Sequence, residues 1–116
     1  MINLKIIEKL YTNNKLVCDI ECSCKNKNNI YSYKYDNNKI TFNISEQYFI
    51  RETSEYILKL SNNKYSLNLK EINKDFEIEL KDYSFNFNDN TLKIAYKLDE
   101  NDDAKLIIIN IIQRNI

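Results

Sequence analysis

The chain of 116 residues contains no glycine, no proline, no histidine and no tryptophan. Without histidine it lacks the commonest general base and the commonest zinc ligand, so catalysis or metal binding would depend on carboxylates, lysine, tyrosine or cysteine. The sequence also has no glycine-rich phosphate loop and no set of residues with the spacing of metal ligands. We therefore expect a protein that is not an enzyme and that uses no cofactor and no metal.

Neither sign of charge is in excess, because 17 basic and 17 acidic side chains cancel. A protein that binds nucleic acid mainly by neutralising phosphates needs a surplus of lysine and arginine on one face. There is no run of about 18 apolar residues that could span a bilayer. Residues 1–8 alternate polar with apolar instead of forming the core of a signal peptide. These features predict a cytoplasmic protein with neither nucleic acid nor membrane as a partner.

What the sequence does contain is an alternation of polar and apolar residues with a period of two, which is typical of strands that bury one face. The clearest run covers residues 16–24. Residues 46–53 are less regular, and they are the only place where a helical turn is expected. The other predicted strands cover residues 2–11, 31–35, 40–44, 56–60, 65–69, 76–80, 83–87, 92–98 and 106–112.

The tripeptide Asn-Asn-Lys stands between alternating runs three times, at 13–15, 37–39 and 62–64. Two-residue hairpin turns need positive φ, and asparagine accepts it best when glycine is missing. Short strands joined by tight turns predict one antiparallel all-β domain over residues 1–116, either a sandwich or a closed barrel. We favour a barrel of eight to ten strands, because closure removes exposed edges that the chain has no proline to protect.

Three stretches carry a resemblance to a known family. They are Asn-Lys-Ile-Thr-Phe at 38–42, which leads to Glu46, then Glu-Tyr-Ile-Leu-Lys-Leu at 55–60, and Leu-Lys-Ile-Ala-Tyr-Lys-Leu at 92–98. Over residues 31–113 their order resembles the YwiB-like family of bacterial proteins, which have a calycin-like β-barrel and no established activity. The chain differs from that family at 61–64 and 71–75, where family members carry an arginine and glycines. The resemblance implies a lipocalin-like barrel that can hold a small apolar ligand, although a shared fold is only an analogy for function.

The leading functional hypothesis is a binding protein without enzymatic activity. Its barrel would hold a small apolar or amphipathic ligand, or its rim would present a site for one. A barrel of eight strands can be filled by its own side chains, and a structure without a cavity of small-molecule size would refute the ligand hypothesis. The residues predicted to line the site lie on the regular apolar faces and are Cys18, Ile20, Cys22, Phe42, Phe85, Phe87 and Tyr96.

Two clusters could hold a metal ion, but each has a simpler interpretation. Cys18, Cys22 and Cys24 lie at even spacing on one strand. Residues two apart on a strand are about 6.6 Å apart, whereas thiolates that share a zinc ion lie roughly 4 Å apart. We therefore interpret the cysteines as small core residues. The carboxylates at Asp99, Glu100, Asp102 and Asp103 lack the spacing of a calcium loop, and we interpret them as a solvated hairpin turn.

The remaining alternatives concern surfaces. Tyr31, Tyr33 and Tyr35 either fill one side of the barrel, with their hydroxyl groups near its rim, or stack nucleic acid bases. The last predicted strand, 106–112, is apolar on both faces. It is either a central strand packed on both sides or an edge presented to another subunit. The second functional hypothesis is a non-enzymatic protein-interaction or structural module that acts as a homodimer, chiefly through this strand. It predicts that lysine at Ile109 or Ile111 weakens the dimer.

Overall fold

The computed structural model describes residues 2–99 and 101–115, with side chains described for 4–99 and 101–112. Within these residues no helix is long and apolar enough to cross a membrane. The strands are β1 (Ile2–Thr12), β2 (Lys15–Lys27), β3 (Ile30–Tyr35), β4 (Asn38–Asn43), β5 (Tyr48–Glu52), β6 (Tyr56–Ser61), β7 (Lys64–Leu69), β8 (Lys74–Glu79), β9 (Asp82–Asn88), β10 (Thr91–Lys97) and β11 (Lys105–Asn115).

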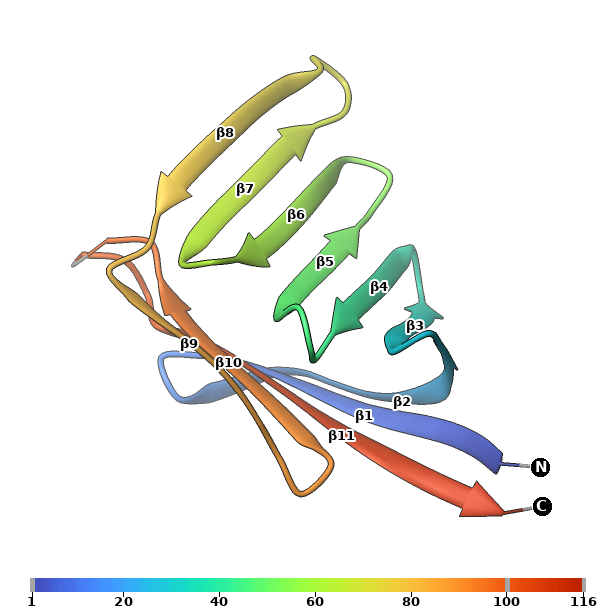
Figure 1. Cartoon of the computed structure of the whole chain (residues 1–116). Helices are drawn as coiled ribbons and strands as arrows, with labels where there is room; N and C mark the ends of the chain where they lie inside the picture. The colour runs from blue at the N-terminus through green and yellow to red at the C-terminus, as the bar shows by residue number, and fades with distance from the viewer. Residues whose placement is uncertain (1, 100, 116) are drawn as a thin grey trace.

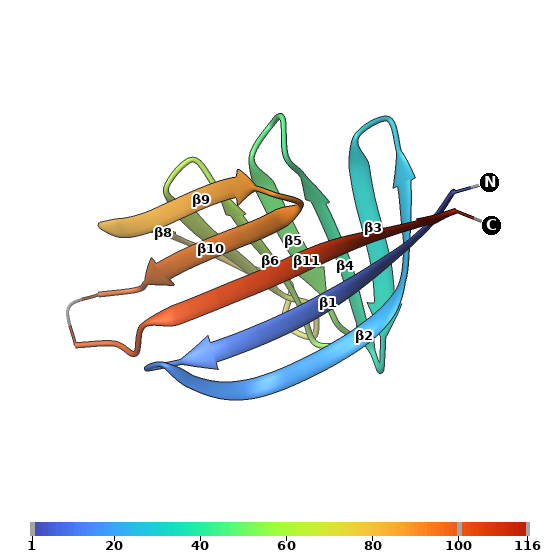
Figure 2. The same cartoon turned by 90° about the horizontal axis from the view of Figure 1, so that it is seen from below.

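These strands form one sheet in the order β8-β7-β6-β5-β4-β3-β2-β1-β11-β10-β9, and every neighbouring pair is antiparallel. The sheet curls into a half-barrel with two facing layers. Strands β3 to β8 make one layer, and β9, β10, β11, β1 and β2 make the other (Figure 1, Figure 2). The long strand β2 joins them, because its first part pairs with β1 and residues 25–27 pair with β3. Pairing of β1 with β11 brings the two ends of the chain together.

The predicted all-β antiparallel fold is confirmed, with eleven strands where we expected eight to ten. The additional strand is β5, in the segment where a helical turn was expected. Its inward-facing residues are Phe49 and Arg51, so a charged side chain interrupts the apolar alternation that identifies a strand from sequence. The expectation of a closed barrel is wrong for the described strands, since β8 and β9 end the sheet as separate edges.

Asparagine and aspartate make the tight turns. Asn13 and Asn14 have φ of 50° and 65°, and Asn62 and Asn63 have φ of 52° and 62°. Positive φ at both central residues is what type I′ hairpin turns require. In the middle tripeptide the turn lies one residue earlier than expected, because β3 ends at Tyr35 and β4 begins at Asn38. Asparagine thus supplies the conformations for which most proteins use glycine.

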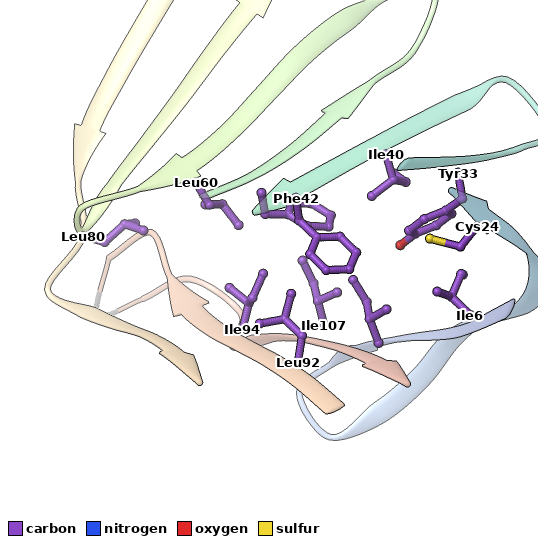
Figure 3. Close-up of a cluster of buried hydrophobic side chains, with 12 residues drawn as sticks. Ile6, Cys24, Tyr33, Ile40, Phe42, Leu60, Leu80, Leu92, Ile94 and Ile107 are labelled. Atoms are coloured by element: carbon purple, nitrogen blue, oxygen red, sulfur yellow. The ribbon is translucent and has the colours of Figure 1, made fainter. Parts of the chain in front are cut away.

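The core lies between the two layers, where apolar side chains from each layer face those of the other (Figure 3). Phe42 and Phe49 come from one layer and are fully buried, and so are Leu92 and Ile109 from the other. Tyr31 stacks on Phe42 with ring centroids 5.0 Å apart. The interior of the half-barrel is therefore filled by its own side chains along this part of its length, as close-packed protein interiors are.

The last strand, β11, is central, because it pairs with β1 on one side and β10 on the other. The alternative that it is an edge presented to another subunit is therefore wrong. Its inward residues Ile107 and Ile109 are buried in the core, while Ile108 is half-buried on the outer face. Lysine at Ile109 would consequently disrupt the core of a single chain and cannot report on a dimer.

Candidate functional site at the mouth of the half-barrel

The inward face of β1 carries one charged residue, Glu8, whose side chain is completely buried. It lies on the same face of β1 as the apolar residues Leu4, Ile6 and Leu10, and it is opposite Ile109 on β11. An isolated buried carboxylate is very costly, so it must be paired and hydrogen-bonded to be tolerated. The alternation of β1 points the side chain of Glu8 into the interior, and its hydrogen-bond partners come from the opposite layer.

Both carboxylate oxygens of Glu8 accept hydrogen bonds. The hydroxyl of Tyr33 donates to Oε1 at 2.5 Å, and the hydroxyl of Tyr35 donates to Oε2 at 2.6 Å. Arg51 Nη2 also lies 3.1 Å from Oε2 and forms an ion pair with it. Bonds to an ionised acceptor are short and strong, and three of them replace the water that Glu8 gives up on burial.

Arg51 reaches this cluster from β5 and links it to the open end of the half-barrel, which we call its mouth. Its Nη1 donates to the Tyr35 hydroxyl at 2.7 Å and approaches Asn38 Oδ1 at 3.4 Å. The guanidinium carbon lies 5.7 Å from the ring centroid of Phe49. Burial alone would lower the pKa of Arg51, but Glu8 and Tyr35 outweigh that effect and raise it. Arg51 is therefore a permanent cation at the inner end of the mouth.

The phenols of the cluster are held in their neutral form. Burial is the largest cause that raises the pKa of Tyr33, and it is joined by the adjacent negative charge of Glu8. The same two causes, with the hydrogen bond to Glu8, raise the pKa of Tyr35. A phenol that donates to a carboxylate loses this bond when it ionises, so the proton stays on the hydroxyl. The four residues form a satisfied network of one anion, one cation and two neutral donors.

At the end of the half-barrel, beside Arg51, the inward faces leave a pocket of about 230 Å³. Apolar side chains from both layers line it, among them Leu10, Leu58 and Ile107. Polar groups are Lys105, which is half-buried, and the phenol of Tyr96. The complete lining is Leu10, Tyr11, Thr12, Val17, Arg51, Tyr56, Leu58, Tyr96, Lys105, Leu106 and Ile107. We call this site the mouth pocket.

The mouth pocket combines an apolar wall with positive charge. Arg51 and Lys105 contribute two cations, Glu8 lies behind Arg51 as its counter-charge, and the negative charge of Asp102 also acts on Tyr96. Burial raises the pKa of Tyr96 to about 12, so its hydroxyl is a donor at neutral pH. Pockets that bind small molecules are mostly apolar with a few placed polar groups, although about 300 Å³ is their usual lower limit. This arrangement suits a ligand that is small, amphipathic and negatively charged at one end.

The seven residues that were predicted from the sequence to line a ligand site all face the interior. One of them, Tyr96, borders the mouth pocket, and the other six are not among its lining residues. Phe42 is a fully buried core residue, and Phe85 and Phe87 pack against the core from β9. The three remaining residues are half-buried on the inward face of β2 and are Cys18, Ile20 and Cys22.

The cysteines and the loop carboxylates have local roles in the described structure. All three cysteines are free thiols, and burial raises the pKa of Cys24 to about 11. The side chain of Asp99 accepts from the amide of Asn101 at 2.7 Å, and that of Asp103 accepts from Asn13 at 2.6 Å. Glu100 lies outside the described residues. Within the described part, no three histidine, cysteine or acidic residues come close enough to hold a metal ion.

The three tyrosines of β3 point inward, as expected if they fill one side of the barrel. Tyr33 is 3% exposed, and its ring lies 6.3 Å from that of Tyr35. Rings in this position do not form an exposed platform for stacking bases. The hydroxyl groups of Tyr33 and Tyr35 contact Glu8, a residue that the alternating pattern did not single out.

Comparison with known proteins gives no relative. No family model, no curated protein and no solved structure matches the chain. The site therefore has to be interpreted from its own geometry. Glu8 and Arg51 were missed because each occupies an inward position where the pattern expects an apolar side chain. The signal was present for Glu8, which follows Leu4 and Ile6 at the same spacing of two.

Proposed function

We propose that the protein is a non-enzymatic binding protein whose mouth pocket takes a small amphipathic anion, such as a carboxylate with a short apolar tail. The observation that carries the proposal is the position of Arg51 and Lys105 beside an apolar wall built from both layers. The tail would lie against Leu58 and Ile107, and the head would accept bonds from Lys105 and Tyr96. The filled interior favours the rim over the inside of the barrel as the place for a ligand.

We also propose that the half-barrel is of the calycin type and related to the YwiB-like family. Support comes from the strand order, in which sequential strands are neighbours except at β8 and β9, as in an up-and-down barrel. A structure-based alignment with a member of that family tests the relation. Agreement of strand order and of the resembling stretches is expected, and a different strand order would refute it.

The test of the ligand proposal is an NMR titration with straight-chain carboxylates of increasing length. Each buried methylene contributes about 0.8 kcal/mol, so the affinity should rise about fourfold per methylene until the pocket is full. Amide shifts should concentrate near Leu10, Leu58 and Ile107. Affinity that does not depend on chain length, or shifts spread over the outer face, would refute the proposal.

Variants of the protein test the contribution of the charged head of the ligand separately from that of its apolar tail. Lys105→Gln should weaken binding of a carboxylate more than binding of the alcohol of the same length, because the alcohol carries no charge. Lys93→Gln is the matched control, since Lys93 is exposed on the outer face of β10. Equal effects of the two variants would show that Lys105 acts only through the total charge of the protein.

A further inference from the structure

The sheet has two free edges, which lie on consecutive strands. Among the described strands, β8 is hydrogen-bonded to β7 alone and β9 to β10 alone. The two strands diverge from the short connection at residues 80–81 (Figure 1). Leu80 is buried there, and its amide donates to the carbonyl of Asn63 at 2.7 Å. The connection is thus fixed while both edges remain without a partner strand.

The number of strands explains why these edges do not pair with each other. Ten antiparallel steps separate β8 from β9 in the sheet, so both strands run in the same sense within it. Direct pairing would be parallel, and a parallel pair needs a crossover of about a dozen residues, whereas residues 80–81 supply two. A closed ring of antiparallel strands needs an even number. One added strand, antiparallel to its neighbour, would make twelve.

The side chains of β8 alternate between its two faces. Phe76 and Ile78 are on the inward face, since they are opposite Leu67 and Tyr65, and each is 40% exposed. Lys74 precedes them on the same face, and its Nζ lies 5.3 Å from the ring centroid of Phe76. The outward face carries only carboxylates, at Asp75, Glu77 and Glu79, and all three residues are exposed. Asn68 donates to Asp75, and Lys64 pairs with Glu77, while no ion pair of Glu79 occurs among the described residues. Exposed apolar residues on a strand edge mark a site for another strand.

We propose that the edge of β8 binds an extended peptide in which apolar residues alternate with lysine or arginine. The peptide would add to the sheet antiparallel to β8 by main-chain hydrogen bonds, which is β-strand addition. Its apolar side chains would cover Phe76 and Ile78 on the inward face. Its basic side chains would lie beside the carboxylates on the outward face, and opposite charges on neighbouring strands are favourable.

A second copy of the chain fits this edge poorly. Residues directly opposite in an antiparallel pair share a face, so two copies of β8 would either place their carboxylates opposite each other or place carboxylates opposite Phe76 and Ile78. The first arrangement is repulsive, and the second leaves apolar residues on both faces. The acidic row therefore disfavours self-pairing and selects a partner of opposite charge.

The probe is a synthetic peptide of alternating lysine and valine, titrated into the full chain and followed by NMR and calorimetry. Shifts should centre on β8, and affinity should fall as salt rises. Two control peptides test the chemistry: one alternates glutamate with valine, and one has the lysines and valines in separate blocks. The affinity of each control peptide should be at most about a tenth of the affinity of the probe.

Charge reversal on the protein tests the edge itself. Glu79→Lys should weaken binding of the probe at least fivefold, whereas Glu21→Lys, on the exposed outer face of β2, should leave it unchanged. Both positions are exposed on strands, so neither change should impair folding. N-methylation of alternate probe residues blocks main-chain donors on one side of the peptide. Loss of binding with at least one of the two methylated sets supports strand addition.

Four outcomes would overturn the proposal. They are binding that survives both methylation sets, equal binding of the alternating and blocked peptides, shifts centred on another surface, and equal effects of Glu79→Lys and Glu21→Lys. A dimer in the absence of peptide that protects the β8 amides from exchange would assign the edge to a second copy instead. None of these outcomes depends on the mouth pocket, because β8 contributes no residue to its lining.

Discussion

Glu8→Gln should destabilise the fold by about 3–5 kcal/mol, which is the usual cost of breaking a buried ion pair by removing one partner. Glu8 is fully buried and accepts bonds from Tyr33, Tyr35 and Arg51. Glutamine keeps the shape but replaces one acceptor oxygen by a donor group, which must then face donors. It also leaves the guanidinium of Arg51, with 10% of its side chain exposed, without a counter-charge. Both effects act in the same direction.

A double-mutant cycle measures how far the two residues depend on each other. Arg51→Met should cost a similar amount, because it leaves the carboxylate of Glu8 with only the two phenols as partners. In the double variant Glu8→Gln/Arg51→Met no charge is buried. Its cost should therefore fall short of the sum of the single variants by about 2–3 kcal/mol, which is the size of coupling found between residues of one network.

The assay is urea unfolding at neutral pH, followed by tyrosine fluorescence and circular dichroism. With an m-value of about 1.5 kcal/mol/M, a loss of 3 kcal/mol lowers the midpoint by about 2 M. The matched control is Glu52→Gln, which breaks the exposed pair of Glu52 with Lys70 and should cost less than about 1 kcal/mol. Additive effects in the cycle, or a cost for Glu8→Gln no larger than that of the control, would refute the reasoning.

Three further predictions follow from burial. Because burial raises the pKa of Tyr33, and that of Tyr96 to about 12, the unfolded chain loses these protons first as the pH rises. Stability should hold below about pH 10 and then fall by about 1.4 kcal/mol per pH unit for each such phenol; phenolate absorbance that accounts for all nine tyrosines before unfolding would contradict this. Burial also raises the pKa of Cys24, so a thiol reagent should modify it at neutral pH at the rate of unfolding and not faster. Finally, Ile109→Ala should cost about 2–5 kcal/mol and Ile108→Ala less, as thermal unfolding can show, since the first side chain is fully buried and the second is not.

Ten of the strands were predicted because apolar residues recur in them with enough regularity, even though Glu8 interrupts the row in β1 and the last strand is apolar on both faces. The eleventh, β5, was missed for the same reason that the buried network was missed. Arg51 occupies an inward position in β5, and Glu8 occupies one in β1. A periodicity rule treats a charged residue as outward-facing, and it fails where two charges are buried as a pair. Their partnership joins residues 43 positions apart, which no local pattern contains.

The predicted ligand-lining residues show the same division between local and non-local information. Alternation identified inward faces, and Phe42, Phe85 and Tyr96 do face inward. Which inward residues border open space depends on how far the two layers converge along the half-barrel. The pocket arises where side chains of β1, β2, β5, β6, β10 and β11 meet at one end, and Tyr96 is the predicted residue placed there.

Local information in the sequence was enough to predict antiparallel strands, the buried face of most of them and the position of most turns, because a period of two and the positive φ of asparagine are local properties. The tertiary structure alone decided that Glu8 is buried against Arg51, that the mouth pocket opens beside them, and that β8 and β9 stay unpaired. These features depend on contacts between distant strands and on the count of strands around the sheet. Eleven antiparallel strands cannot close a ring, and no single strand carries that information.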